Sequence, residues 1–107
     1  MAFVEYFKYY DEYEKEYNNV VVFMEMGTFM CSYEYNGVGR CVEVGRLLTL
    51  AVTQPNTKLD LSVQNPHMIG FPKASTSKYI PVLLKNNYSV VWIEQENVRG
   101  KITRKKT

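Results

Sequence analysis

The residues able to do acid–base or metal chemistry are few and scattered along the chain. One histidine, His67, and two cysteines, Cys31 and Cys41, lack the spacing of zinc ligands. One possible bridge does not make a disulfide framework, so we expect two buried or partly buried free thiols. Nothing marks a serine as an activated nucleophile beside His67. The sequence therefore predicts no metal site.

Three carboxylates make the best case for an enzyme. Glu94 and Glu96 end an apolar run, a usual place for the metal-binding acids of a nuclease, and Asp60 could join them. No lysine follows at the usual spacing, and Asp60 falls in a segment that we expect to be a loop. A binding role is therefore favoured over a nuclease, which would show magnesium-dependent cleavage lost in Glu94→Ala.

Charge is distributed unevenly, although the formal net charge is only +2. Acids dominate the first stretch, where Lys8 and Lys15 are outnumbered, and the last stretch has bases alone. A basic tail can bind phosphates by releasing counterions, or it can be a solubilising end. The acids are Glu5, Asp11, Glu12, Glu14 and Glu16, and the tail bases are Arg99, Lys101, Arg104, Lys105 and Lys106.

The composition is that of a folded protein. A chain of 107 residues with 46% hydrophobic and 22% charged residues predicts a single compact domain. No apolar run approaches the roughly 18 to 20 residues that cross a bilayer. Residues 1–6 lack the basic and apolar regions of a secretory signal, so we expect an intracellular location.

The elements that must position any site follow from periodicity. Tyr6, Tyr10, Tyr13 and Tyr17 recur at helical spacing, which predicts an amphipathic helix with an aromatic core face. Apolar and alternating runs predict strands, and Gly27-Thr28 divides the first two into an antiparallel pair. The expected helices are Phe3 to about Glu16, Cys41–Leu47 and Ser75–Lys85, with Pro81 in the first turn of the last. The expected strands are Val20–Met26, Phe29–Tyr35, Leu48–Thr53, Met68–Pro72, Tyr88–Ile93 and an edge strand Ile102–Lys105, with a turn at 37–39 and a surface loop at 54–66.

Together these elements predict an α/β (α+β) fold, in which a mixed β-sheet is flanked by helices. The order of local motifs resembles domain I of the MutS family of DNA mismatch repair proteins. The resemblance extends over nearly all of the chain. It rests on Val22–Phe29 (a Met-Gly-x-Phe turn after an apolar strand), Leu47–Thr53, Gly70-Phe71-Pro72, Lys78–Leu84, Tyr88–Gln95 with its Glu-Gln ending, and Gly100 with Arg104.

The resemblance implies a mismatch-recognition domain over residues 1–107, excised from a longer chain. Asn65–Pro72 and Leu84–Tyr88 look closest to the MutS branch of giant DNA viruses and octocoral mitochondria. A viral factory, the cytoplasm or a mitochondrion would then be its location. The domain itself would be no enzyme and hold no cofactor. The parent protein would bind ATP and Mg in another domain and form a dimer on mismatched or distorted duplex DNA, without a membrane.

The resemblance also implies a site. In the family, the Phe of a Phe-x-Glu motif wedges into the minor groove and stacks on a mispaired base, while the Glu hydrogen-bonds that base. By position Phe29 is the wedge, and Met30 and Cys31 follow it. Without the resemblance, Phe29 reads as an inward residue of its strand. The basic candidates for contact with DNA are Lys73, Lys78 and Arg104.

The chain departs from the family pattern at several positions. Met30 replaces a Tyr, and Cys31 replaces the Glu, whose hydrogen bond a thiol cannot supply. Thr53-Gln54-Pro55 replaces Thr-Lys-Arg, and Ala74 replaces a His. The domain could therefore recognise distortion without mismatch discrimination. Alternatives are a module for branched DNA, or a protein-interaction domain that keeps the fold and has lost contact with DNA.

Overall fold

The computed structural model describes the backbone of residues 2–96 and 99–105 and the side chains of residues 3–93. The helices are α1 (Ala2–Glu16), α2 (Cys41–Leu48) and α3 (Thr76–Lys85), and a short 3-10 helix, η1 (Lys73–Ser75), precedes α3. The strands are β1 (Val20–Met26), β2 (Phe29–Tyr35), β3 (Val38–Gly39), β4 (His67–Pro72), β5 (Ser89–Glu96) and β6 (Arg99–Lys105).

The described strands form one mixed sheet with β1 in its interior. β1 pairs antiparallel with β2 and parallel with β5, and β6 adds an antiparallel edge to β5. β2 also pairs antiparallel with β4 and, at its C-terminal end, with the two-residue β3. The predicted mixed sheet flanked by helices is confirmed, as is the edge strand formed by the last described residues.

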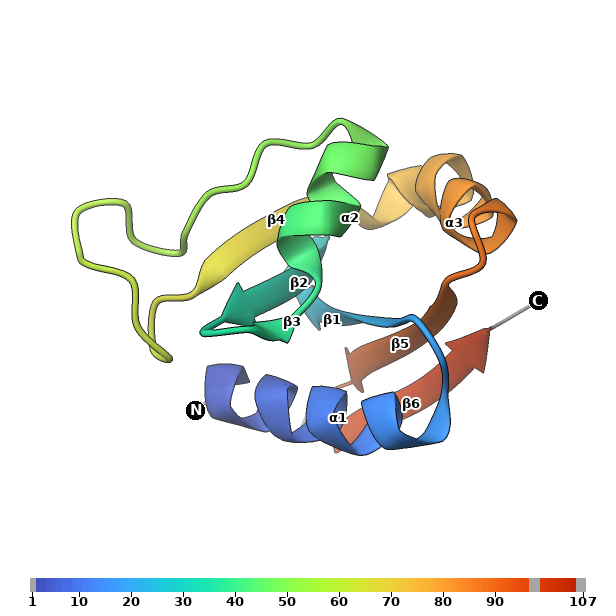
Figure 1. Ribbon diagram of the computed structural model, residues 1–107, viewed down its shortest axis with the longest axis horizontal. Helices are drawn as coiled ribbons and strands as arrows, with labels where there is room; N and C mark the ends of the chain where they lie inside the picture. The colour runs from blue at the N-terminus through green and yellow to red at the C-terminus, as the bar shows by residue number, and fades with distance from the viewer. Residues whose placement is uncertain (1, 97–98, 106–107) are drawn as a thin grey trace.

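Helices cover both faces of the sheet, as Figure 1 shows: α1 lies on one side, and α2 and α3 lie on the other. Successive residues of a strand point to opposite faces, so a strand covered on both sides is apolar throughout. Val20 and Val22 of β1 therefore pack with α1, while Val21 and Phe23 pack with α2 and α3. This double burial explains why β1 has no polar residue before Glu25.

The aromatic stripe of α1 is a core face, as its spacing predicts. Tyr6, Tyr10 and Tyr13 are buried against the sheet. The Tyr6 hydroxyl donates a 2.7 Å hydrogen bond to the Val22 carbonyl oxygen and lies 3.0 Å from the Ser32 hydroxyl. A buried hydroxyl needs such partners, so Tyr6 fixes where α1 lies on the sheet.

The strand predicted at Leu48–Thr53 is wrong. Leu48 is the last residue of α2, and Thr49 takes a left-handed conformation with φ of 61° that ends the helix. The Leu50 amide then bonds back to the Gly45 carbonyl at 2.8 Å. Only Thr53 makes a β-bridge, to Met68. Leu47 and Leu48 end a helix whose inner face is buried. A short apolar run does not show whether it forms the end of a buried helix or a strand.

Two further predictions about elements need correction. Pro81 is the sixth residue of α3, in its second turn rather than its first. Pro81 forfeits one backbone hydrogen bond there, and the burial of Ile80 and Leu83 against the sheet offsets that loss. The turn expected at 37–39 is tighter than predicted, since Val38 and Gly39 already pair with β2.

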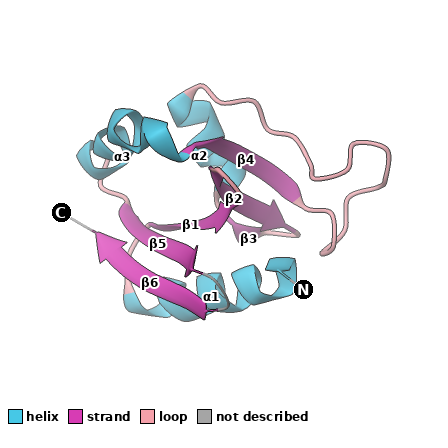
Figure 2. Cartoon of the chain, turned by 180° about the vertical axis from the view of Figure 1, so that it is seen from behind, coloured by secondary structure: helices cyan, strands magenta, loops and turns pink. Residues whose placement is uncertain are grey.

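The predicted surface loop at 54–66 is confirmed and extends away from α3, as Figures 1 and 2 show. The buried Asn65 side chain organises it, with its amide nitrogen donating to the carbonyl oxygens of Asn56, Leu59 and Asp60. Among the described residues, no helix combines the length and apolar character required to cross a membrane.

Candidate nucleic-acid interface

The hairpin of β1 and β2 ends in a two-residue turn, Gly27-Thr28, closed by the pair Met26 and Phe29. Gly27 has a φ of 64°, which glycine adopts without strain, whereas Thr28 has no positive φ. This pattern is that of a type II′ turn, which matches the twist of the paired strands. The sequence thus builds a tight tip and places an aromatic ring directly after it.

Phe29 is the exposed residue of this tip. Its side chain is 45% exposed, whereas large side chains in the middle of β1 and β2 are buried. The ring projects on the face of the sheet that α1 covers elsewhere, because Cys31 on the same side belongs to the cluster around α1. The interpretation of Phe29 as an inward core residue is therefore contradicted by its exposure.

Met30 and Cys31 lie differently from what the resemblance implies. Met30 has no exposed area and packs between the sheet and α2 and α3, while Cys31 is 6% exposed and packs beneath α1. Both side chains are buried in the free protein, so contact of Met30 or Cys31 with DNA stays a prediction that their burial does not favour. They are buried because both faces of β2 are covered, so residues after the tip alternate between two cores.

The Cys31 thiol is also the wrong group to replace a carboxylate. Burial raises its pKa above the ordinary value, an effect that the hydrogen bond with Tyr33 only partly opposes. The thiol is therefore neutral, and a neutral thiol is a weak donor and a weak acceptor. Cys41 is equally buried, and desolvation raises its pKa to about 12, with the nearby Glu34 charge acting in the same direction. Both thiols are free, as predicted.

β4 supports the tip from the side. Phe29 lies opposite Pro72, and the Lys73 amide donates a 2.9 Å hydrogen bond to the Thr28 carbonyl oxygen. The Lys73 ammonium forms an ion pair and hydrogen bond with the Glu25 carboxylate. The turn is thus held by both main-chain and side-chain contacts. Sequence reasoning missed Glu25, although a single acid in an otherwise apolar strand was a usable signal.

Two of the three predicted basic residues are described, and they have different surroundings. Lys73 is beside the tip and is partly neutralised by Glu25. Lys78 is exposed on α3, with its ammonium 5.2 Å from the centre of the Tyr79 ring. The Tyr79 ring in turn packs against Phe71 of β4, with 4.8 Å between ring centres and an angle of 31° between the ring planes. Lys73 must give up its ion pair with Glu25 to bind a phosphate. Among the described residues, the structure records no such ion pair for Lys78, so Lys78 can bind a phosphate at lower cost.

Arg104 lies farther away. It is in β6 opposite Val91, and its side chain is outside the part of the chain that the structure describes. β2, β1, β5 and β6 are successive neighbours, so about 14 Å of sheet, at about 4.8 Å per strand, separates β6 from the tip strand. Arg104 does not belong to the immediate surroundings of Phe29.

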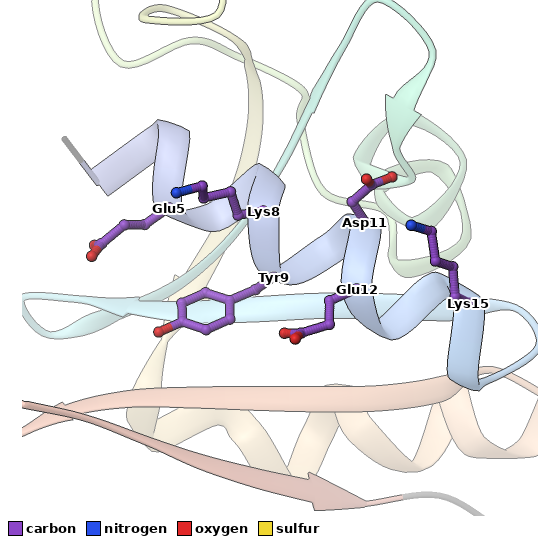
Figure 3. A pocket seen from close by; sticks show the side chains of 6 residues that line it. All are labelled: Glu5, Lys8, Tyr9, Asp11, Glu12 and Lys15. Carbon is purple, nitrogen blue, oxygen red and sulfur yellow. The ribbon is translucent and has the colours of Figure 1, made fainter.

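The outward face of α1 carries mixed charge. Figure 3 shows side chains that line an open depression there, with Glu5, Tyr9 and Glu12 extending to one side of the helix and Lys8 lying along it. Asp11 and Lys15 complete the lining. Residues three and four positions apart face each other on a helix, so acids and lysines here alternate as neighbours. This surface has the character of a solvated helix face, with acids in excess.

The enzyme alternative gains no geometric support from the described side chains. Among them, no three His, Cys, Asp or Glu residues gather closely enough to hold a metal ion. Asp60 is exposed in the long loop, while Glu94 and Glu96 are in β5, with side chains outside the described part.

The comparison with known families identifies the fold. A family model, MutS domain I, matches residues 5–106, which is nearly the whole chain, so this chain belongs to the MutS domain I family. Domain I is the mismatch-recognition, DNA-binding domain of that family and is not its ATPase domain. A search of curated proteins finds no significant match.

Proposed function

We propose that this domain recognises mispaired or distorted duplex DNA by inserting Phe29 into the minor groove. The observation that carries the proposal is the Phe29 ring, 45% exposed at the end of a paired hairpin whose central large apolar side chains are buried. An exposed aromatic ring on a rigid support is the shape that separates stacked bases. The domain I match supports a DNA-binding role for the surface.

The physical basis of selectivity is the cost of deforming the duplex. Opening a base step costs a few kcal/mol when the bases are well stacked and paired, and less at a mismatch. The exposed part of the Phe29 ring gains apolar contact equally at any step, so the difference in cost decides where it inserts. Selection of this kind requires no reading of base sequence.

Cys31 changes what such a domain can discriminate. No carboxylate stands two residues after Phe29, and the buried thiol cannot hydrogen-bond a base. The proposed readout therefore depends on stacking and flexibility alone. We expect flexible lesions, such as an unpaired base, to be preferred over a G·T pair that retains two hydrogen bonds.

Phosphate contacts would hold the domain in place. Lys78 lies exposed, and Lys73 must exchange Glu25 for a phosphate to take part. Arg104 belongs to this set only if the duplex extends across the sheet toward β6. Contacts of this kind fix orientation, and they weaken as salt concentration rises.

A second candidate is a module that keeps the fold without mismatch discrimination, binding branched DNA or another protein. The Lys73–Glu25 pair favours it, because it neutralises the basic residue nearest to the tip. The excess of acids on α1 favours a protein partner in particular. Such a module would show no preference between matched and mismatched duplexes.

The remaining expectations accompany the proposal. The domain itself is proposed to catalyse nothing and to hold no cofactor. The ATP and Mg of the resembling proteins would be bound by other domains of a parent protein, which would place two such domains on one duplex. The assignment to the giant-virus and octocoral branch stays part of the same proposal.

The test is an NMR titration of the isotopically labelled chain at low salt with two duplexes that differ only in one unpaired base. We expect shifts centred on Thr28, Phe29 and Lys73, stronger with the unpaired base, while the remote exposed Leu59 stays still. Equal, diffuse shifts with both duplexes would leave only electrostatic binding and contradict the wedge. No shifts with either duplex would favour the protein-interaction alternative.

A further inference from the structure

Gly70 occupies a position in β4 where its backbone does not require glycine. Its φ is not positive, unlike those of Gly27, Gly37 and Gly39, so any residue could adopt its conformation. Glycine inside a strand weakens the strand and often marks a close approach by a neighbouring group. The reason for glycine here must therefore be the space around it.

Phe29 and Cys31, which stand at the positions of the family's Phe-x-Glu motif, border that space. Gly70 lies directly opposite Cys31 in the ladder, two positions along from the pair Phe29 and Pro72 and therefore on the same face. A Cβ at position 70 would lie 3.1 Å from the Cys31 sulfur and 3.7 Å from Cδ2 of the Phe29 ring. It would also be 3.4 Å from the Met30 carbonyl oxygen. One edge of the Phe29 ring thus borders the notch that the missing side chain leaves.

We propose that Gly70 is a positioning residue that fixes the orientation of Phe29 by leaving this notch beside its ring. The inference rests on the proposed role of Phe29 for its functional consequence, but the geometry it asserts belongs to the free protein. Directly opposite and diagonal residues on one face of a sheet touch through their side chains. With no side chain at 70, the space beside Cδ2 of the Phe29 ring and the Cys31 sulfur stays open.

Cys31 is part of the same arrangement. Its sulfur is the atom nearest to the position of the absent Cβ, and the backbone oxygen behind it cannot move without disturbing the ladder. A methyl group at position 70 would therefore crowd the Cys31 sulfur, which would have to shift by a few tenths of an ångström, and would come into ordinary van der Waals contact with the Phe29 ring. The side chain at 31, which does not reach the surface, would influence recognition through the orientation of Phe29.

The first measurement uses the unchanged chain without DNA. Nuclear Overhauser contacts between the Gly70 α-protons and the Phe29 ring protons, with upfield shifts of those α-protons, are the expected result. Three-bond couplings should show one dominant χ1 rotamer of Phe29. Absence of the contacts, or an averaged rotamer, would overturn the proposal, whether or not the domain binds DNA.

The second measurement uses Gly70→Ala. We expect it to fold, to change the Phe29 couplings, and to lower the preference for an unpaired-base duplex about fivefold, the size of effect that an off-rotamer side chain produces. Adding Cys31→Ala removes the nearest contact and should restore both the rotamer and part of the preference. Should Gly70→Ala not fold, the double variant and the measurement on the unchanged chain still decide.

Ile69→Val is the matched control, because Ile69 lies on the same strand and is buried on the opposite face. It should lower stability while leaving the Phe29 rotamer and the preference unchanged. If Gly70→Ala behaves like this control, Gly70 is merely structural and the inference is wrong. If the unchanged chain shows the contacts but no mismatch preference, the function proposed above fails while the geometry of Gly70 stands.

Discussion

Two aromatic groups on the same face of the sheet have opposite surroundings. Tyr6 belongs to α1, the helix that covers one end of this face, which we call the covered end. Its ring is fully buried, and its hydroxyl is hydrogen-bonded to Val22 and Ser32. Phe29 at the hairpin tip extends past this cover and is nearly half exposed. The covered end stabilises the domain, whereas the tip holds an apolar group in water, where it contributes little to folding. The difference in exposure therefore distinguishes residues that stabilise the sheet from Phe29, which can contact a partner.

The largest effect should come from the covered end. Tyr6→Ala removes a fully buried ring and leaves Val22 and Ser32 with an unfilled polar cavity. We expect a loss of about 3 to 5 kcal/mol in the free energy of unfolding, as for other large aromatic truncations in cores. Urea denaturation followed by the fluorescence of Trp92, the single tryptophan, measures it. A loss below about 1 kcal/mol would contradict the role assigned to Tyr6, because it would lie within the range of ordinary surface changes.

Alkaline pH should next weaken the buried cores on both faces of the sheet. Burial holds the Cys41 thiol neutral by raising its pKa from 9.0 to about 12, and it raises that of Tyr10 from 10.0 to about 12. Since the unfolded chain ionises first, stability is fully present below pH 9 and is lost as pH rises toward 12. Urea midpoints at pH 8 and pH 10.5 measure the decline, and Cys41→Ala should reduce it. An unchanged slope in Cys41→Ala would show that the thiol is not the source.

Phe29→Ala should change the preference for distorted DNA and leave stability nearly unchanged, whereas Tyr6→Ala should mainly lower stability. Stability should change by less than about 1 kcal/mol, because the side chain is already half exposed. The preference for a duplex with an unpaired base should fall about tenfold, since the group that exploits weak stacking is gone. Fluorescence anisotropy with both duplexes measures the ratio. Leu59→Ala, which removes another exposed apolar side chain, is the control and should leave the ratio unchanged.

Glu25→Gln should have the smallest effect, and it tests whether the Lys73–Glu25 ion pair limits contact between the tip and DNA. Without the carboxylate, the Lys73 ammonium loses this ion pair and competes better for a phosphate. Affinity for matched and mismatched duplexes should then rise together by about two- to threefold at low salt, and the slope of log affinity against log salt should steepen by about one. Titrations at several salt concentrations test this. An increase confined to the mismatched duplex would show that Glu25 acts on recognition itself.

The covered end was largely predictable from sequence. Tyr6, Tyr10 and Tyr13 of α1 repeat at helical spacing. Val20 to Phe23 is too apolar for a strand with one face in water. The strand predicted at Leu48–Thr53 failed because Thr49 adopts a left-handed cap, a conformation that periodicity does not reveal. Pro81 was misplaced for a related reason: an exposed proline can be carried by a helix whose opposite side is buried.

The tip was predictable only in part. Gly27-Thr28 marks a turn, and the residue after a tight turn often lies at the surface, so Phe29 could be picked out with help from the family resemblance. The burial of Met30 and Cys31 could not be seen, because it depends on α2, α3 and α1 covering both faces of β2. The Lys73–Glu25 pair joins residues 48 positions apart, and only the pairing of β2 with β4 brings them together.

The most direct test of the central claim is to observe Phe29 in contact with DNA. The labelled chain would be bound to a duplex with one unpaired base, and nuclear Overhauser contacts between Phe29 ring protons and minor-groove protons would be recorded. We predict contacts at the unpaired base and its neighbour, and none with the perfect duplex. Binding in which the Phe29 ring keeps its free-state shifts and contacts no base would contradict the wedge.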